Sequence, residues 1–155
     1  MNILIIYDSV FGNTEKVAQE LYDTLKENNK VEIRKVDKMN TTMVKEIDLI
    51  ILGSPTRGFS PTKPMTQFVK SLETDNDAMK VAIYDTRIDY MQIKSRLARN
   101  IVHKGGYANQ KMAKVIKNKG IRVVEPLEAF YVIESEGPLK DGELKRAKDW
   151  IEKIQ

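Results

Sequence analysis

The sequence predicts an α/β fold in which helices cover both faces of a five-stranded parallel sheet. Three short segments with continuous apolar centres, Ile3–Tyr7, Ile47–Leu52 and Lys80–Asp85, are rich in β-branched residues and too short for helices. Such segments are typical of strands that are buried on both faces. Amphipathic segments separate them, and the repeated βα alternation favours a three-layer, doubly wound fold. We expect the strand order 2-1-3-4-5.

The helices are predicted from apolar residues at helical spacing. Val17, Leu21 and Leu25 recur every four residues, which indicates one apolar face on the first helix. The helices predicted in this way cover residues 14–28, 62–72, 93–101 and 107–119, and a final segment whose buried stripe is Leu144, Ala147, Ile151 and Ile154.

The remaining strands are less regular than the three buried ones. Val31–Val36 alternates apolar and polar residues, which indicates a half-exposed strand at a sheet edge. Ile121–Val124 and Ala129–Ile133 are predicted to be two halves of one last strand, interrupted near Pro126. No repeat or shift in composition divides the chain, so we expect residues 1–155 to form a single domain.

Composition excludes several classes of function. The chain has 155 residues, enough to bury its own core, and it contains no Cys, so disulfides, thiolate nucleophiles and Cys-ligated metals are excluded. The single histidine, His103, has no other metal ligand near it in the sequence, and no metal site or catalytic side chain is predicted. No basic leader precedes the first strand and no apolar run could span a membrane, so a cytoplasmic protein is expected.

The charge is unevenly distributed along the chain. The net charge is only +4, yet residues 90–124 contain nine Lys and Arg and no acid. These cations are either solvated helix faces or a patch for an acidic protein or another polyanion. Few aromatic residues lie among them, so base stacking has little support and no nucleic acid is expected as a partner.

The loop Ser9–Thr14 joins the first strand to the first helix. The first N–H groups of a helix have no internal partner, and the helix dipole places roughly +0.5 charge there, so such a loop can bind an anion. Ser9, Asn13 and Thr14 add side-chain donors. A single glycine, Gly12, and no lysine argue against nucleoside triphosphates and dinucleotides. The loop therefore predicts a phosphomonoester site, with an ordinary βα turn as the alternative.

Three loops leave the carboxyl ends of strands that the predicted order makes neighbours: Ser9–Thr14, Gly53–Pro64 and Asp85–Tyr90. Ligands of open α/β sheets bind at the carboxyl ends of the strands, where the strand order reverses. We therefore expect the three loops to converge on one site.

On these motifs the sequence resembles the flavodoxins, and specifically the short-chain kind. The residues that carry the resemblance are Tyr7-Asp-Ser9-x-x-Gly12-Asn13-Thr14-x-x-x-Ala18, Gly53-Ser-Pro-Thr-Arg57, Asp85-Thr-Arg87 and the closing segment Gly137 to Trp150. The resemblance implies FMN as the cofactor and electron transfer between redox protein partners as the function. It also implies a monomer that catalyses no substrate reaction alone.

The resemblance also implies a role for each loop. The phosphate would be held by Ser9, Gly12, Asn13 and Thr14 and by the backbone N–H groups from Val10 through Phe11 to Thr14. The ribityl chain and one side of the flavin ring would be lined by Pro55, Thr56, Arg57, Gly58 and Phe59. The other side of the ring would be approached by Asp85, Thr86 and Arg87, with Tyr90 as the second stacking residue and Tyr107 in reserve.

Two features depart from the family pattern. Phe11 stands where Ser or Thr is usual, which removes one phosphate hydroxyl. The segment from Ile88 to Gly106 is longer and more basic than the acidic ring-side loop of typical flavodoxins, so partners with acidic docking faces are expected. Two other functions stay open: a small FMN-dependent oxidoreductase of the quinone or protoporphyrinogen type, and a binding domain of this fold that has lost FMN.

Overall fold

The structure, a computed structural model, describes residues 1–40, 44–89, 91 and 93–154, apart from the side chains of Ile101 and Val102. One sheet contains all the strands, in the order β2-β1-β3-β4-β5, with β6 also paired to β4, and every pairing is parallel. This confirms the predicted order 2-1-3-4-5. The strands are β1 (Asn2–Tyr7), β2 (Lys30–Lys35), β3 (Leu49–Pro55), β4 (Lys80–Ile88), β5 (Arg122–Val123) and β6 (Glu128–Val132).

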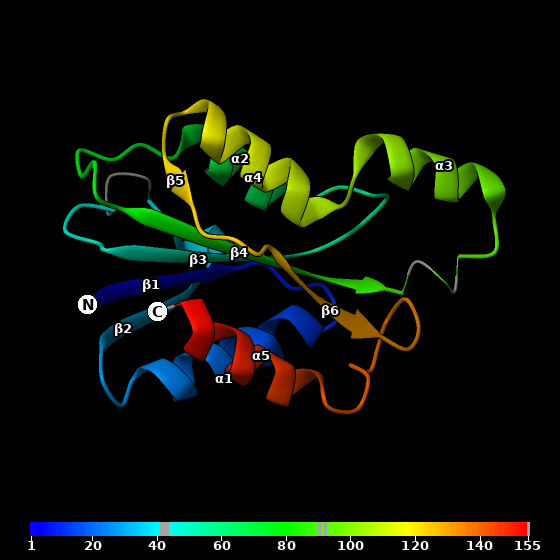
Figure 1. Ribbon diagram of the computed structural model, residues 1–155, viewed down its shortest axis with the longest axis horizontal. Coiled ribbons are helices and arrows are strands. Elements are labelled where there is room, and N and C mark those ends of the chain that lie inside the picture. Colours follow the sequence, from blue (N-terminus) through cyan, green and yellow to red (C-terminus); the bar gives the residue numbers. More distant parts are fainter. Residues whose placement is uncertain (41–43, 90, 92, 155) are drawn as a thin grey trace.

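The last strand is split, as the sequence predicted. β5 lies beside Lys80 and Val81 at the start of β4, and β6 lies beside residues 84–88 at its end. The two short strands therefore occupy successive positions along the same edge of β4. This arrangement carries the chain of β6 to the end of the sheet where the other carboxyl ends lie (Figure 1).

Helices cover the sheet in two layers (Figure 1). On one face lie α1 (Asn13–Leu25) and α5 (Glu143–Ile154), and on the other lie α2 (Lys63–Ser71) and α4 (Ala108–Asn118). A short 3₁₀ helix, η1 (Val36–Lys38), follows β2. The helix α3 (Arg96–Gly105) extends beyond the carboxyl ends of the strands instead of covering the sheet. No helix in the described ranges is long and apolar enough to cross a membrane.

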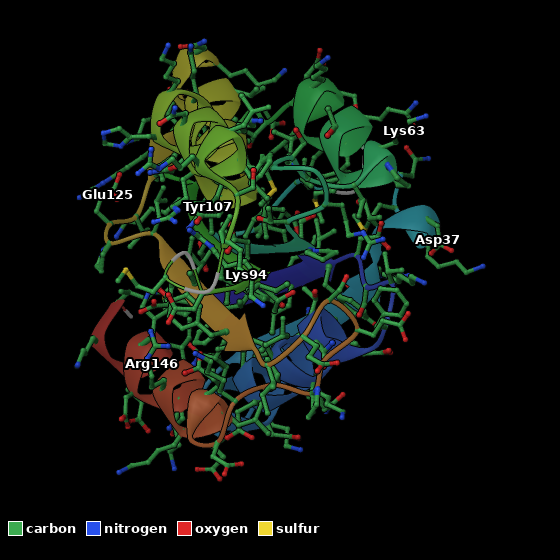
Figure 2. The ribbon with its side chains drawn as sticks, turned by 90° about the vertical axis from the view of Figure 1, so that its right-hand side faces the viewer. Asp37, Lys63, Lys94, Tyr107, Glu125 and Arg146 are labelled. Carbon is green, nitrogen blue, oxygen red and sulfur yellow. The ribbon has the colours of Figure 1, made fainter. Side chains whose placement is uncertain are left out.

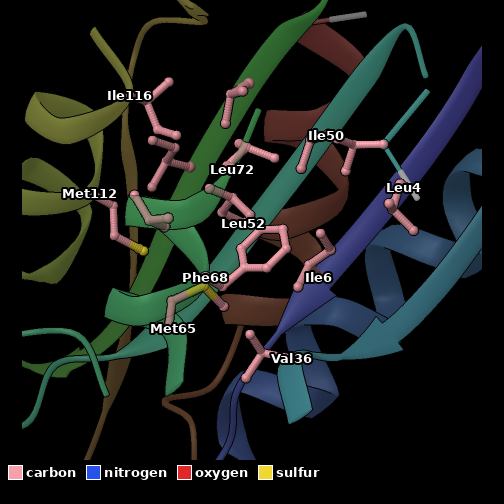
Figure 3. Packing of buried hydrophobic residues seen from close by; sticks show 14 of the residues in the cluster. Leu4, Ile6, Val36, Ile50, Leu52, Met65, Phe68, Leu72, Met112 and Ile116 are labelled. Atoms are coloured by element: carbon pink, nitrogen blue, oxygen red, sulfur yellow. The ribbon is translucent and has the colours of Figure 1, made fainter. Parts of the chain in front are cut away.

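Each face of the sheet buries its own apolar cluster. On the α2 and α4 side, Leu52, Phe68 and Ile116 pack together with their neighbours (Figure 3). On the α1 and α5 side, Leu21 and Ile151 pack against the sheet. Burial of apolar surface on both faces explains why the central strands are apolar throughout.

Several expected boundaries and burials were wrong. The sequence prediction ended the third strand at Leu52 and placed Gly53 to Pro55 in a loop, but these residues pair in register with residues 84–86 of β4. β4 continues to Ile88 because Arg87 and Ile88 pair with Tyr131 and Val132 of β6. The apolar stripes of two helices are also not as predicted, because Leu97 of α3 and Leu144 of α5 are exposed, while Trp150 is buried in place of Leu144.

Candidate functional site

A pocket open to solvent lies at the carboxyl ends of β1, β3 and β4. All three predicted loops contribute to it, so the expected convergence is what the structure shows. The pocket is lined by Ser9, Val10, Phe11, Asn13, Thr14, Pro55, Thr56, Arg57, Thr86, Arg87, Ile88, Val132 and Ser135.

The loop between β1 and α1 presents its backbone N–H groups. Gly12 has a φ of +86°, which an L residue rarely adopts and glycine adopts without penalty. None of the N–H groups from Val10 to Thr14 donates to an acceptor among the described residues; the next ones, of Glu15 and Lys16, bond to Ser9 and Gly12. Five consecutive donors are therefore available to an anion at the start of α1.

Three hydroxyl groups add to these donors. The Ser9 hydroxyl oxygen accepts from the N–H of Glu15 at 3.3 Å and so keeps its own proton for another acceptor. The hydroxyls of Thr14 and Thr86 lie 2.8 Å apart in a buried contact. One of them donates to the other, and the second retains a proton that can be donated to a ligand.

The side chain of Asn13 has a hydrogen-bond partner outside the loop. Its Nδ2 donates to the carbonyl oxygen of Glu136 at 3.0 Å, and Gly137 lies so close that a Cβ there would meet the Asn13 amide at 2.6 Å. The amide therefore ties the loop to the segment before α5, and the expectation that it also adds a phosphate donor stays a prediction. The backbone N–H of Asn13 remains available.

Tyr84 and Tyr7 fix the loop from within the fold. The Tyr84 hydroxyl donates to the carbonyl oxygen of Thr14 at 3.1 Å, and its ring fills the space that a Cβ on Gly53 would occupy, at 2.1 Å. The Tyr7 hydroxyl donates to Glu15 at 2.8 Å, and burial together with this bond raises the pKa of Tyr7 to about 12. Both hydroxyls are therefore held in their protonated, donating form.

The second loop contains a tight turn. Arg57 and Ser60 exchange two backbone hydrogen bonds of 2.8 and 3.0 Å, and both residues between them have positive φ, +51° at Gly58 and +63° at Phe59. The Arg57 guanidinium lies 5.1 Å from the centre of the Phe11 ring, so the first two loops meet across the pocket. Gly58 and Phe59 themselves lie outside the pocket wall.

Asp85 lies behind the pocket and does not line it. Its carboxylate is fully buried and accepts from Arg87 Nε at 2.7 Å, from the Thr56 hydroxyl at 3.0 Å and from the N–H of Asn109 at 3.1 Å. Burial raises the pKa of Asp85, and the Arg87 guanidinium acts against that shift. The side chain expected at the pyrimidine end instead joins β4, the second loop and the start of α4.

Arg87 lines the pocket, and the Tyr107 ring packs against its guanidinium. The guanidinium lies 3.7 Å from the centre of the Tyr107 ring and is held by Asp85, so it is fixed from two sides. Tyr107 does not line the pocket, and Tyr90 lies outside the described residues. A stacking role for Tyr90 stays a prediction.

Three wall residues, Ile88, Val132 and Ser135, escaped the sequence interpretation. Val132 ends β6, Ser135 follows it, and β6 lies beside the end of β4. The rule that ligands bind at the carboxyl ends of strands also applies to this last strand. Because the last strand is split into β5 and β6, the sequence did not reveal that the carboxyl end of β6 reaches the same pocket.

The residues present fit an anionic group attached to a flat, partly apolar body. The free N–H groups and hydroxyls lie together at the start of α1, while Pro55, Ile88 and Val132 give the rest of the pocket an apolar wall. Within the described part of the chain, no three His, Asp or Glu residues gather as metal ligands would. The site is therefore suited to binding an organic phosphate through neutral donors.

Comparisons with known proteins agree with this geometry. A family model described as "Flavodoxin domain" matches residues 4–125. No curated protein sequence gives a significant match. Among solved structures, a flavodoxin from the domain Archaea is similar, with 20% identity, a TM-score of 0.75 and coverage of 99% of this chain and 96% of that one.

Two further solved structures bear on the fold. Flavodoxin 1 from Bacillus cereus has 20% identity and a TM-score of 0.72, with coverage of 99% of this chain and 97% of that chain. Rubredoxin oxygen:oxidoreductase from Desulfovibrio gigas has 13% identity and a TM-score of 0.72, but the 99% of this chain that aligns corresponds to only 35% of that protein. The present fold thus occurs both as a separate chain and within a larger one.

Proposed function

The chain belongs to the flavodoxin domain family, and from this premise we propose that it binds one FMN non-covalently and carries electrons between redox proteins. The observation that carries the proposal is the set of five N–H groups from Val10 to Thr14 that donate to no described acceptor, in a loop that lines a pocket with apolar walls. FMN, when bound, supplies the redox chemistry by accepting and releasing electrons. We further propose that the protein works as a cytoplasmic monomer.

The residues of this chain bind and orient the cofactor. The N–H groups of the first loop, with the Ser9 hydroxyl and the Thr14–Thr86 pair, would hold the phosphate. Thr56 and Arg57 on one side and Arg87 on the other would flank the flavin ring. Phe11, which replaces a usual hydroxyl, contributes an apolar wall next to Arg57 instead of a hydrogen bond.

The two arginines give the pocket a positive potential. Arg57 and Arg87 both line it, and Arg87 is the better fixed of the two because it is paired with Asp85 and stacked on Tyr107. A cation beside the ring favours the reduced, negatively charged cofactor over the oxidised one. The protein partners would have acidic docking faces, in keeping with the basic segment 90–124.

The proposal is tested by titrating the purified protein with FMN and with riboflavin, which lacks the phosphate. We expect one FMN per chain, quenched flavin fluorescence, and an affinity for FMN at least about tenfold above that for riboflavin, since a good anion contact contributes a kcal/mol or more. Stepwise anaerobic reduction should resolve two one-electron steps in the absorption spectrum.

Matched variants locate the site. Thr14→Val removes a hydroxyl that lines the pocket and should weaken FMN binding without changing riboflavin binding. Thr24→Val, the same change on the same helix, removes a hydroxyl that only donates to the carbonyl of Glu20 and should change neither. Absence of FMN uptake would refute the proposal, and steady turnover with NAD(P)H and a quinone would assign the oxidoreductase function instead.

A further inference from the structure

A basic groove lies between the C-terminal end of α3 and the N-terminal end of α4. It is open to solvent, and its lining includes the cations Arg87, Lys104, Lys111 and Lys114 together with His103. Gly105, Gly106 and the N-cap residue Tyr107 form its floor between the two helices. No acidic side chain lines it.

The three lysines of the groove are not neutralised within the described part of the fold, whereas Arg87 is paired with Asp85. Lys104, Lys111 and Lys114 form no ion pair with any described residue, whereas Lys117, one turn farther along α4, pairs with Glu125 at 2.7 Å. Of the 26 Lys and Arg, nine lie in residues 90–124 with no acid, which leaves 17 cations and 22 acids, a net −5, for the rest of the chain. The molecule is therefore strongly polarised, and its positive segment includes this groove.

The groove shares a wall with the proposed FMN pocket. Arg87 lines both, and its side chain is only 11% exposed because it is paired with Asp85 and stacked on Tyr107. On the other side, Lys111 Nζ donates to the hydroxyl of Ser60 at 3.0 Å, which connects the groove to the turn at residues 57–60. A molecule seated in the groove would thus lie next to the Arg87 side chain that also lines the pocket.

The same end of the molecule exposes apolar side chains. Leu97 of α3 is 71% exposed and Met91, just before α3, is 84% exposed. Figure 2 looks onto this end and shows Lys94 near its middle and Tyr107 above it, toward the helices of the α4 side. Charged residues around a few apolar ones are the usual composition of a protein–protein interface.

We propose that the groove between α3 and α4 is the docking surface for the acidic face of a redox protein partner. The inference rests on the proposed electron-transfer function, since it explains why a basic groove adjoins the cofactor pocket. Unpaired cations attract an acidic protein over a distance, which raises the association rate, and the exposed Leu97 and Met91 supply the short-range contact. Nucleic acid is the weaker choice, because few aromatic residues accompany the cations.

Two double variants with the same net charge test the proposal. Lys104→Glu with Lys114→Glu reverses two charges of the groove, and Lys16→Glu with Lys145→Glu reverses two exposed charges on α1 and α5, on the other side of the sheet. Each pair of reversals lowers the net charge by four, from +4 to 0. Both sets lie outside the cofactor pocket, so FMN uptake should stay as in the wild type.

The measurement is stopped-flow electron transfer from the reduced, FMN-loaded protein to an acidic b-type cytochrome and, for comparison, to a basic c-type cytochrome. We expect the groove variant to react with the acidic cytochrome about tenfold more slowly at low salt, and the α1/α5 variant to react about as fast as the wild type. The difference should disappear near 1 M salt, where the Debye length is about 3 Å.

Each other outcome has a defined meaning. Equal slowing by both variants would overturn the proposal, because net charge alone would then explain the effect, and no slowing by either would also overturn it. If the wild-type protein took up no FMN, the proposed function would be refuted. The docking surface could then still be tested by measuring how tightly the wild-type protein and the two double variants bind the acidic cytochrome. Tighter binding of a DNA duplex or of phosphatidylserine vesicles, lost in the groove variant, would assign the groove to those partners and overturn the proposal.

Discussion

At the scale of single residues, the turn at Arg57–Ser60 shows how backbone conformation shapes the rim of the site. Gly58 and Phe59 both adopt positive φ, +51° and +63°, and Phe59 does so with a bulky side chain. The left-handed region costs an L residue roughly 1–2 kcal/mol, so the two hydrogen bonds between Arg57 and Ser60 must hold the turn against that strain. A position of this kind tolerates glycine and few other residues.

A pair of Gly→Ala variants measures this strain. Gly58→Ala should lower the free energy of unfolding by about 1 kcal/mol, because a Cβ at Gly58 meets no neighbour and only the positive φ opposes it. Gly105→Ala also meets no neighbour, but Gly105 is helical, so this variant should be neutral or up to about 1 kcal/mol more stable. Urea unfolding measures the change in the free energy of unfolding for each variant. Equal changes would show that the positive φ at Gly58 does not cause the difference expected between them.

Residue types could be predicted from the sequence better than side-chain directions. Ser9 and Thr14 lie in the pocket wall as expected, because a loop between a strand and a helix places them there whatever surrounds it. The Asn13 amide, however, donates to the carbonyl oxygen of Glu136, and Asp85 lies behind the wall and accepts from the start of α4. Their partners lie far off in the sequence, and no local pattern encodes such contacts.

At the scale of elements, periodicity located the helices but did not fix which faces they bury. In α1, Leu21 points into the core as its spacing predicted, because α1 lies flat on the sheet. In α3 an equally regular spacing leaves Leu97 exposed, because the helix extends beyond the ends of the strands and has no sheet beneath it. An amphipathic pattern shows that a helix has an apolar side, and the surroundings decide what that side contacts.

The same substitution in both helices tests this difference. Leu21→Ala should lower the free energy of unfolding by about 2–5 kcal/mol, since the side chain is fully buried and its loss leaves a cavity. Leu97→Ala should change it by no more than about 0.5 kcal/mol. Chemical denaturation followed by circular dichroism gives both values. A loss above about 1 kcal/mol for Leu97→Ala would mean that α3 packs against the rest of the protein.

At the scale of the whole molecule, the strand order could be predicted because it follows from connections between consecutive elements. Parallel strands need crossovers, the crossovers that follow β1, β3 and β4 contain α-helices, and few orders let helices cover both faces. The carboxyl ends then meet at one place regardless of individual contacts. The two helical layers, however, bury separate clusters, represented by Ile116 on one side and Ile151 on the other, and only the sheet joins them.

Whether these two clusters fold as one domain is tested by a double-mutant experiment. Ile116→Val and Ile151→Val each remove one methylene from a fully buried side chain and should each cost about 1 kcal/mol. Because the sheet separates the sites, the double variant should show the sum within about 0.5 kcal/mol. If residues 1–155 form one domain, fluorescence and circular dichroism will report a single transition in every variant. Two separate transitions, each moved by only one substitution, would mean that the layers unfold independently.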